Sequence, residues 1–309
     1  MNKSKRKSLN HIISFCFVIY ALFFMNGCNT NQAFMCYDSE KYVDLYDYSQ
    51  EVVDSDYLKI TEEDIEMIIE TELSANEAYV EITSKVKAEN NDILLLAVGG
   101  EYQYYFLGGE DNLEEDEQML LDSSVDEIIT LKDSLGELVT ATVCGIYRKA
   151  TIKDVDFILD YYGYSNWNEL ERFVRNRASD EIIYNLLFDK ITEHSTILGV
   201  PKEIQIQIEK EIRQNKSQIL ENYSSMNDYL NDNSISYEEF ESSISQYYYE
   251  LMIYKSILDN ENLTVTNAEV NDYRLKNSLG KNYSDYYIYQ QIAFEKVKKR
   301  LVDIAKIID

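Results

Sequence analysis

The sequence has few of the residues on which most catalytic chemistry depends. It contains two histidines, four cysteines, one proline and ten glycines in 309 residues. His11 lies in an apolar N-terminal stretch, and His194 is expected to be a surface residue near a helix C-terminus. Because catalytic triads and most zinc sites use histidine, we expect no Ser–His or Cys–His catalysis and no metal site. No phosphate loop or dinucleotide-binding glycine motif is present, so no cofactor is expected.

Positive charge is also scarce. The chain has 29 basic and 56 acidic residues, a net charge of −27. Four of the basic residues precede the apolar N-terminal stretch, and without them the net charge is −31. Such a chain repels phosphate backbones, which excludes nucleic acid as a partner. The acidic residues are spread along the chain, which indicates solvated helix faces and, as a weaker alternative, attraction of basic clients.

One long apolar run is present, and it lies at the N-terminus. A basic segment precedes Ile12 to Met25, 14 residues that are too few to span a bilayer comfortably. The run ends at Met25-Asn-Gly-Cys28, which resembles a bacterial lipoprotein box, with a small residue before a cysteine that can carry diacylglycerol. We therefore predict a signal peptide at 1–27, lipidation of Cys28, and a location on the extracytoplasmic face of the cell membrane. The alternative is an ordinary secretory signal followed by a chance cysteine.

The remaining cysteines do not form a disulfide framework. Cys16 leaves with the signal peptide and Cys28 is the lipidation site, so only Cys36 and Cys144 are left. A disulfide between them is compatible with an extracytoplasmic location, but no spacing motif supports it. Their state is left open.

The first half of the remaining chain indicates a tether and then a β-rich domain. Residues 28–59 are predicted to be a tether with a short strand over 43–48. Thr61 and Asp64 resemble a capping box, so a helix is expected to run from there to about residue 78. Short runs rich in β-formers then alternate with glycines and predict a small antiparallel sheet. These runs are Tyr79–Ile82, Ile93–Val98, Tyr102–Leu107, Ile128–Leu131 and Leu138–Val143.

From Asp154 onward the apolar period is helical. Gly199 is expected to close a long helix and Pro201 to open the next at its first position, which folds the chain into a helical hairpin. The predicted fold class is therefore α+β. It consists of a small antiparallel β domain over 60–150 and a larger all-α domain over 151–309.

The order of segments resembles the trigger factor family of folding chaperones. The strand over 43–48 and the helix after Thr61 are similar to the elements before that family's FKBP-type isomerase domain. Asn91-Asp-Ile93 and Phe106-Leu-Gly-Gly109 are similar to motifs inside that domain. Leu198-Gly-Val-Pro-Lys-Glu203 resembles a junction in the family's helical chaperone domain. The resemblance covers most of the chain after the signal peptide, and it implies an FKBP-like domain followed by a helical chaperone domain.

Departures from the family pattern limit what the resemblance implies. No ribosome-docking Gly-Phe-Arg segment precedes the β domain, so no ribosome partner is expected. Ala97, Val98 and Leu107 stand where the isomerase pocket has an acid or an aromatic residue. Phe106 and Tyr104 are then the pocket candidates, and ordinary sheet packing explains them equally well. The domain is predicted to be degenerate, with weak or absent peptidyl-prolyl isomerase activity.

Tyrosine clusters are the candidates for binding unfolded clients, because tyrosine offers a large apolar area with a polar tip. The two clusters comprise Tyr247, Tyr248, Tyr249, Tyr286, Tyr287 and Tyr289. The alternative is that these rings cap the edges of a core. The leading hypothesis is a lipid-anchored chaperone for unfolded secreted polypeptides. An active isomerase and a surface module with one dedicated protein partner are its rivals.

Overall fold

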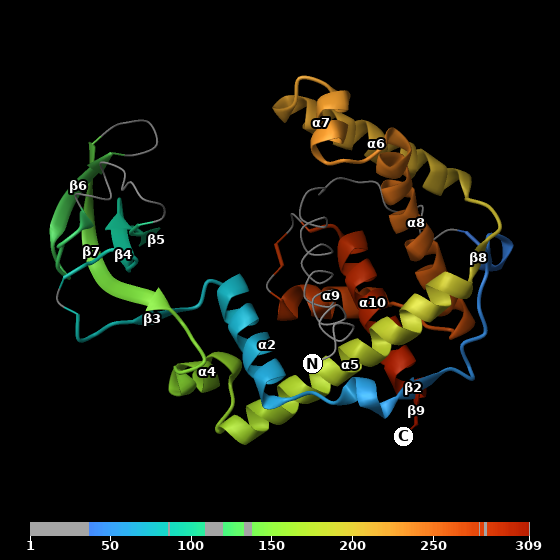
Figure 1. Ribbon diagram of the computed structural model, residues 1–309, viewed down its shortest axis with the longest axis horizontal. Helices are drawn as coiled ribbons and strands as arrows, with labels where there is room; N and C mark the ends of the chain where they lie inside the picture. The colour runs from blue at the N-terminus through green and yellow to red at the C-terminus, as the bar shows by residue number, and fades with distance from the viewer. Residues whose placement is uncertain are drawn as a thin grey trace. The chain divides into compact units, whose positions relative to one another are not determined.

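The computed structural model describes residues 37–85, 87–108, 120–132, 138–277, 279–280 and 283–308. The chain divides into two compact units. The helical unit contains the described residues up to Lys59 and those from Ser179 onward, and the sheet unit lies between Ile60 and Ala178 (Figure 1). Helix α5 (Trp167–His194) begins in the sheet unit and continues into the helical unit. The fold class is α+β, as predicted.

The sheet unit is built on antiparallel strands in the order β3-β7-β4-β5, with β6 also paired to β7. The strands are β3 (Tyr79–Glu81), β4 (Ile93–Val98), β5 (Glu101–Phe106), β6 (Ile128–Lys132) and β7 (Leu138–Lys149). Gly99 and Gly100 join β4 to β5 with φ values of 60° and 91°, which only glycine adopts readily. One face of the sheet carries the β core, which includes Leu94, Leu96 and Val143. The sheet unit therefore has a small hydrophobic core of its own.

The described part of the sheet unit also contains α2 (Glu62–Ala75), α4 (Val155–Tyr162) and the first part of α5. Thr61 and Asp64 form the predicted capping box of α2. The hydroxyl of Tyr162 donates to Glu72 of α2 at 2.6 Å, and Arg177 of α5 pairs with the same carboxylate. These contacts hold α4 and the start of α5 against α2.

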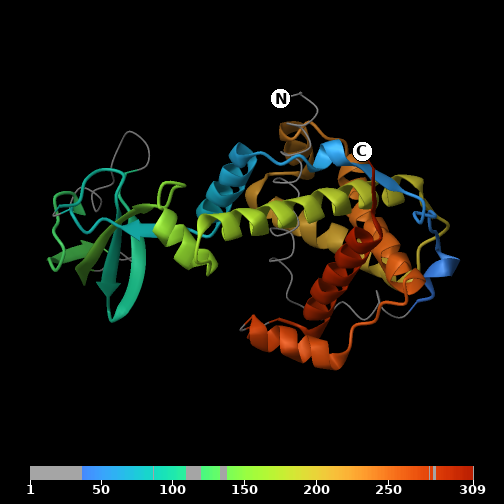
Figure 2. The same ribbon diagram turned by 90° about the horizontal axis from the view of Figure 1, so that it is seen from below.

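Besides the rest of α5, the described part of the helical unit contains five α-helices. They are α6 (Lys202–Asn222), α7 (Met226–Asp232), α8 (Tyr237–Asn260), α9 (Asn267–Lys276) and α10 (Asp285–Ile304). The main core of this unit joins α5, the second half of α8 and α10, and includes Ile191, Ile257, Val297 and Leu301. Helix α9 packs against α10 through a smaller cluster that contains Val270 of α9 and Ile288 and Ile292 of α10 (Figure 2).

The segment expected to be a tether packs against the main core of the helical unit already at Tyr37, the first described residue. Strand β1 (Val43–Asp44) pairs with β8 (Thr196–Ile197), and β2 (Val52–Asp54) pairs in parallel with β9 (Lys306–Ile308). Val43 and Val53 are buried in the main core. The expected domain boundary at 150/151 also differs from the structure. The sheet unit extends to Ala178 because α4 and the start of α5 pack with α2.

The hairpin around Pro201 forms with different boundaries from those predicted. Helix α5 ends at His194, and Gly199 does not close it, because Thr196 and Ile197 leave the helix to pair with β1. Pro201 is the N-cap of α6 and precedes its first residue. The reversal of the chain is therefore made by a short strand and a proline.

Candidate polypeptide-binding surfaces

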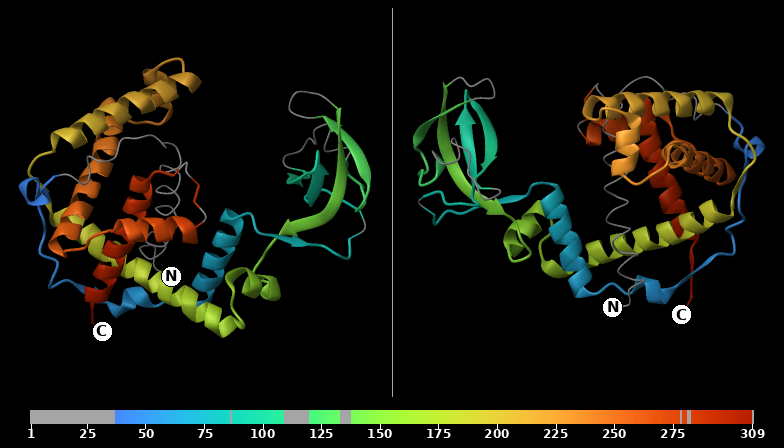
Figure 3. Two further views of the ribbon diagram at one scale, coloured as in Figure 1. Left: turned by 180° about the vertical axis from the view of Figure 1, so that it is seen from behind. Right: turned by 45° about the horizontal axis from the view of Figure 1, so that its top comes forward.

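Helices α6, α7 and the first half of α8 form an arm, defined as residues 202–250, whose base meets the main core through Ile204 and Ile208 of α6 and Tyr248 and Tyr249 of α8 (Figures 1 and 3). All 21 residues of α6 are described, and Ile204 alone among them is buried. The buried residues of the rest of the arm are Leu230 and Phe240. A helix about 30 Å long normally buries an apolar stripe along its length. In α6 most of that stripe is left partly uncovered.

Apolar side chains are exposed at both ends of α6. Ile206 is 50% exposed and Leu220 is 52% exposed, and Tyr237 at the start of α8 is 41% exposed. Fourteen positions correspond to nearly four helical turns, so Ile206 and Leu220 share one flank about 21 Å apart. Ile212 and Ile219 are half-buried on the neighbouring side. The arm thus presents several separate apolar contact points along one helix.

Polar contacts join α6 to α8. Lys216 donates to Glu241 at 3.3 Å and lies 4.5 Å from the ring centroid of Tyr237. The hydroxyl of Tyr248 donates to Glu211 at 3.4 Å. Surface ion pairs of this kind contribute little to stability, typically below about 1 kcal/mol each. We infer that the arm opens locally more readily than the core below it.

The predicted client-binding tyrosines lie at the edges of cores. Tyr247, Tyr248 and Tyr249 are all half-buried, and the latter two pack against the main core. Burial raises the pKa of the hydroxyls of Tyr247 and Tyr248. Tyr287 and Tyr289 pack beside α9, whereas the side chain of Tyr286 lies outside the described residues. These rings contribute to packing, and the more exposed apolar area of the arm is on α6.

Sequence reasoning missed Ile206 and Leu220. The signal was present, since α6 carries isoleucines at 204, 206, 208, 212 and 219 and leucine at 220. These positions cover a wider arc than one partner helix can bury. An excess of apolar positions over available partners indicates exposed apolar side chains.

The predicted pocket residues Tyr104 and Phe106 lie together on strand β5. They are on the face of the sheet opposite the β core, with Tyr104 46% and Phe106 43% exposed. The ring centroid of Tyr79 is 4.7 Å from that of Tyr104 and 5.6 Å from that of Phe106. Tyr147 lies 5.4 Å from Tyr104. We call Tyr79, Tyr104, Phe106 and Tyr147 the aromatic face, in which Tyr104 and Phe106 are exposed and Tyr79 and Tyr147 are half-buried beside them.

The other predicted sites fall outside the described residues or are not brought together. Cys28 and Cys36 are not among the described residues, so lipidation and the Cys36–Cys144 pairing stay predictions. Within the part of the chain that the structure describes, no group of three His, Cys, Asp or Glu side chains is placed to hold a metal ion. No helix among those residues is long and apolar enough to cross a membrane.

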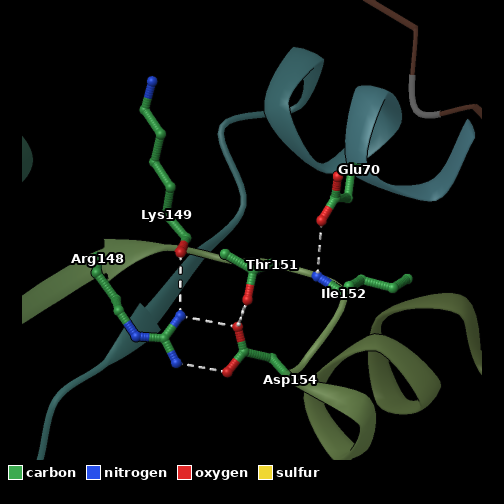
Figure 4. A network of polar contacts seen from close by, with 6 residues as sticks. All are labelled: Glu70, Arg148, Lys149, Thr151, Ile152 and Asp154. Carbon is green, nitrogen blue, oxygen red and sulfur yellow. Dashed lines mark hydrogen bonds and ion pairs between the residues drawn. The ribbon is translucent and has the colours of Figure 1, made fainter. Parts of the chain in front are cut away.

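An ion pair links the last strand of the sheet to the helices of the same unit (Figure 4). Arg148 donates to both carboxylate oxygens of Asp154, at 2.5 and 2.8 Å, and the backbone N–H of Thr151 donates to the same carboxylate at 2.8 Å. The backbone N–H of Ile152 donates to Glu70 of α2 at 3.4 Å. The Arg148 guanidinium holds the pKa of Asp154 well below its usual range.

This ion pair predicts a pH dependence of stability. Asp154→Asn is expected to destabilise the sheet unit at pH 7 by about 1–3 kcal/mol, because the charged hydrogen bonds are lost. A lowered carboxyl pKa stabilises the fold above about pH 4, and this contribution is lost as the pH falls. Urea unfolding from pH 7 to pH 2.5 should therefore show the two proteins converging below about pH 4. Asp156→Asn, an exposed neighbour in α4, is the control, and a constant difference across the pH range would contradict the assignment.

Comparison with known proteins found matches among solved structures alone. No protein-family model and no curated protein matches the chain. Among solved structures, one that matches concerns promiscuous substrate recognition in the folding and assembly activities of the trigger factor chaperone. It is 14% identical over 84% of this chain and 72% of that one, with a TM-score of 0.37. A similarity of this size leaves the function to be argued from the residues of this chain.

Proposed function

We propose that the protein is a lipid-anchored, extracytoplasmic folding chaperone that binds unfolded or newly secreted polypeptides, with weak or absent prolyl isomerase activity. The observation that carries the proposal is helix α6, which presents Ile206 and Leu220 to solvent and buries a single residue. Exposed apolar side chains on a thin arm provide weak contacts that do not depend on a particular client sequence.

The magnitudes favour holding over tight recognition. Full burial of an isoleucine or leucine side chain contributes about 1.5–3 kcal/mol. Two or three such contacts, reduced by the cost of ordering a client, give reversible binding in place of a permanent complex. Without the signal peptide the net charge is −31, which adds long-range attraction for basic clients.

Catalysis is the weaker candidate. Rotation about an X–Pro bond faces a barrier of about 18–20 kcal/mol, which a desolvated apolar pocket lowers by weakening amide resonance. Tyr104 and Phe106 are 46% and 43% exposed on an open face, so they leave a bound prolyl amide in contact with water. This geometry supports holding.

Anchoring by Cys28 rests on the sequence Met25-Asn-Gly-Cys28. Expressed with a metabolically labelled fatty acid, the protein is expected to incorporate the label, and Cys28→Ala is expected to lose it and move to the soluble fraction. Equal labelling of both proteins would remove the anchor from the proposal.

The arm is tested with the double variant Ile206→Ser/Leu220→Ser. The unaltered protein is expected to suppress aggregation of a reduced model substrate at stoichiometric amounts. The variant should need about tenfold more protein for the same effect, since it loses two apolar contacts. Light scattering during reduction of the substrate measures the difference.

A matched control comes from the same unit. Leu275 on α9 is 76% exposed, and Leu275→Ser is expected to suppress aggregation as well as the unaltered protein does. No suppression by the unaltered protein at a large excess would end the chaperone proposal. Recovery of one specific partner by cross-linking, in place of many unrelated clients, would favour the rival of a dedicated partner.

A further inference from the structure

Strand β5 is an edge strand with outward-pointing backbone groups. Among the described strands it pairs only with β4. The two-residue turn with positive φ at both positions is of type I′, so the flanking pair Val98–Glu101 is hydrogen-bonded. Pairing then alternates along the ladder, and 102, 104 and 106 are non-hydrogen-bonded positions. The N–H and C=O groups of Tyr102, Tyr104 and Phe106 therefore point away from β4.

The same positions place aromatic rings next to this edge. Tyr104 and Phe106 belong to the aromatic face, and Tyr102 is exposed beyond them. Tyr147 lies over Gly145, where an added Cβ would come within 2.7 Å of the ring. The glycine thus lets the Tyr147 ring lie close against the sheet. Main-chain donors and acceptors and an apolar surface are available along one edge.

Within its described residues, β5 carries none of the common sequence features that block an edge strand. Natural edge strands are commonly blocked by lysine, proline or a β-bulge. The sequence of β5, Glu-Tyr-Gln-Tyr-Tyr-Phe, contains neither lysine nor proline, and its register with β4 is unbroken. The edge is thus able to serve as a template for an added strand.

We propose that β5 binds an extended segment of an unfolded polypeptide as an additional β-strand. Alternate apolar side chains of that segment would pack on the aromatic face, and basic side chains would point away from it. The proposal deepens the chaperone function and rests on it, since it names extended, non-acidic segments as the client class recognised by the sheet unit. Recognition of this kind draws affinity from main-chain hydrogen bonds and specificity from alternate side chains.

Charge decides between this occupant and a second copy of the chain. Two copies with a net charge of −27 each repel one another, whereas a lysine-containing segment is attracted. Glu101 on β5 and Glu81 on β3 are exposed acidic residues of the sheet. Lys149 is the basic group near the face, 5.9 Å from the ring centroid of Phe106. The favoured occupant is therefore an extended segment that alternates apolar with neutral or basic residues.

The probe is a ten-residue peptide that alternates lysine and valine, with ¹³C at the valine carbonyls. Binding to the full chain is measured by fluorescence anisotropy, and strand formation by the isotope-shifted amide I band. We expect Tyr104→Ala/Phe106→Ala to weaken binding about tenfold. Tyr102→Pro should also weaken it, since it removes an outward N–H that β4 does not use. Gln103→Ala, which changes a residue on the opposite face of the strand, should bind the peptide unchanged.

Other results would overturn the proposal for β5 or assign its edge to a different occupant. Equal affinity for the unaltered chain and the double variant would overturn the proposal, as would a bound peptide without the β-strand band. A dimer that is lost in the double variant, with no peptide binding, would assign the edge to a second copy. The arm variant Ile206→Ser/Leu220→Ser should bind the peptide normally. If that variant holds clients normally while the edge variants lose the peptide, the arm proposal fails and the edge proposal stands.

Discussion

Ile257→Ala is expected to destabilise the helical unit by about 2–5 kcal/mol, because it removes three carbon atoms from a fully buried position and leaves a cavity. Ile257 is 0% exposed and lies in the main core with residues of α5 and α10. The total stability of a domain is about 5–15 kcal/mol, so this loss is a large share of it. Hydrogen exchange should show faster exchange throughout the helical unit.

The control for this substitution is Ile206→Ala on the exposed arm, which is expected to change stability by less than about 0.5 kcal/mol. The sheet unit has its own core, so its exchange rates should stay unchanged in Ile257→Ala. Faster exchange of both units to the same degree would contradict the division into two compact units.

Leu96→Ala should have the complementary effect on the sheet unit. Leu96 is 0% exposed in the centre of β4, which has β5 on one side and β7 on the other, and it packs in the β core. A loss of about 2–5 kcal/mol is expected from the cavity. Exchange should accelerate in β4, β5 and β7 while α8 and α10 keep their protection.

Leu138→Ala is the matched control, since Leu138 is 74% exposed at the start of β7. Its expected effect is below about 0.5 kcal/mol. An equally small loss of stability in Leu96→Ala and Leu138→Ala would contradict the burial of Leu96 in the β core.

Local signals in the sequence were sufficient where short-range chemistry decides structure. The capping box of Thr61 and Asp64 marked the start of α2, and the apolar run from Ile93 to Val98 has the same bounds as β4. Both depend on residues within a few positions of one another. The alternation of short β-rich runs with glycines likewise predicted an antiparallel sheet.

Long-range pairings were not predictable in the same way. Val43 pairs with Ile197, and Val52 pairs with Lys306, across most of the chain. Two- and three-residue strands carry almost no signal in the sequence, so the sequence alone predicts a tether with one short strand over 28–59. The end of α5 at His194 was not predictable for the same reason. The residues that follow it pair with β1, far away in the sequence, although the local pattern is helical.

The functional surfaces show a similar limit. The residue type of Tyr247 to Tyr249 predicts client binding, whereas their exposure depends on which helices pack beside α8. The family resemblance points to Tyr104 and Phe106, and the register of β5 determines that they face away from the β core. Residue type indicates what a side chain can bind, whereas packing decides whether it is accessible.

The central claim, that the arm holds unfolded polypeptides, is tested most directly by a photo-crosslinking amino acid placed at Leu220. With a set of unrelated reduced or unfolded proteins, position 220 is expected to cross-link to most of them, and position 275 on α9 of the same unit to few. The folded forms of the same proteins should give little product at either position. Equal yields at 220 and 275, or a product with one protein alone, would contradict the account.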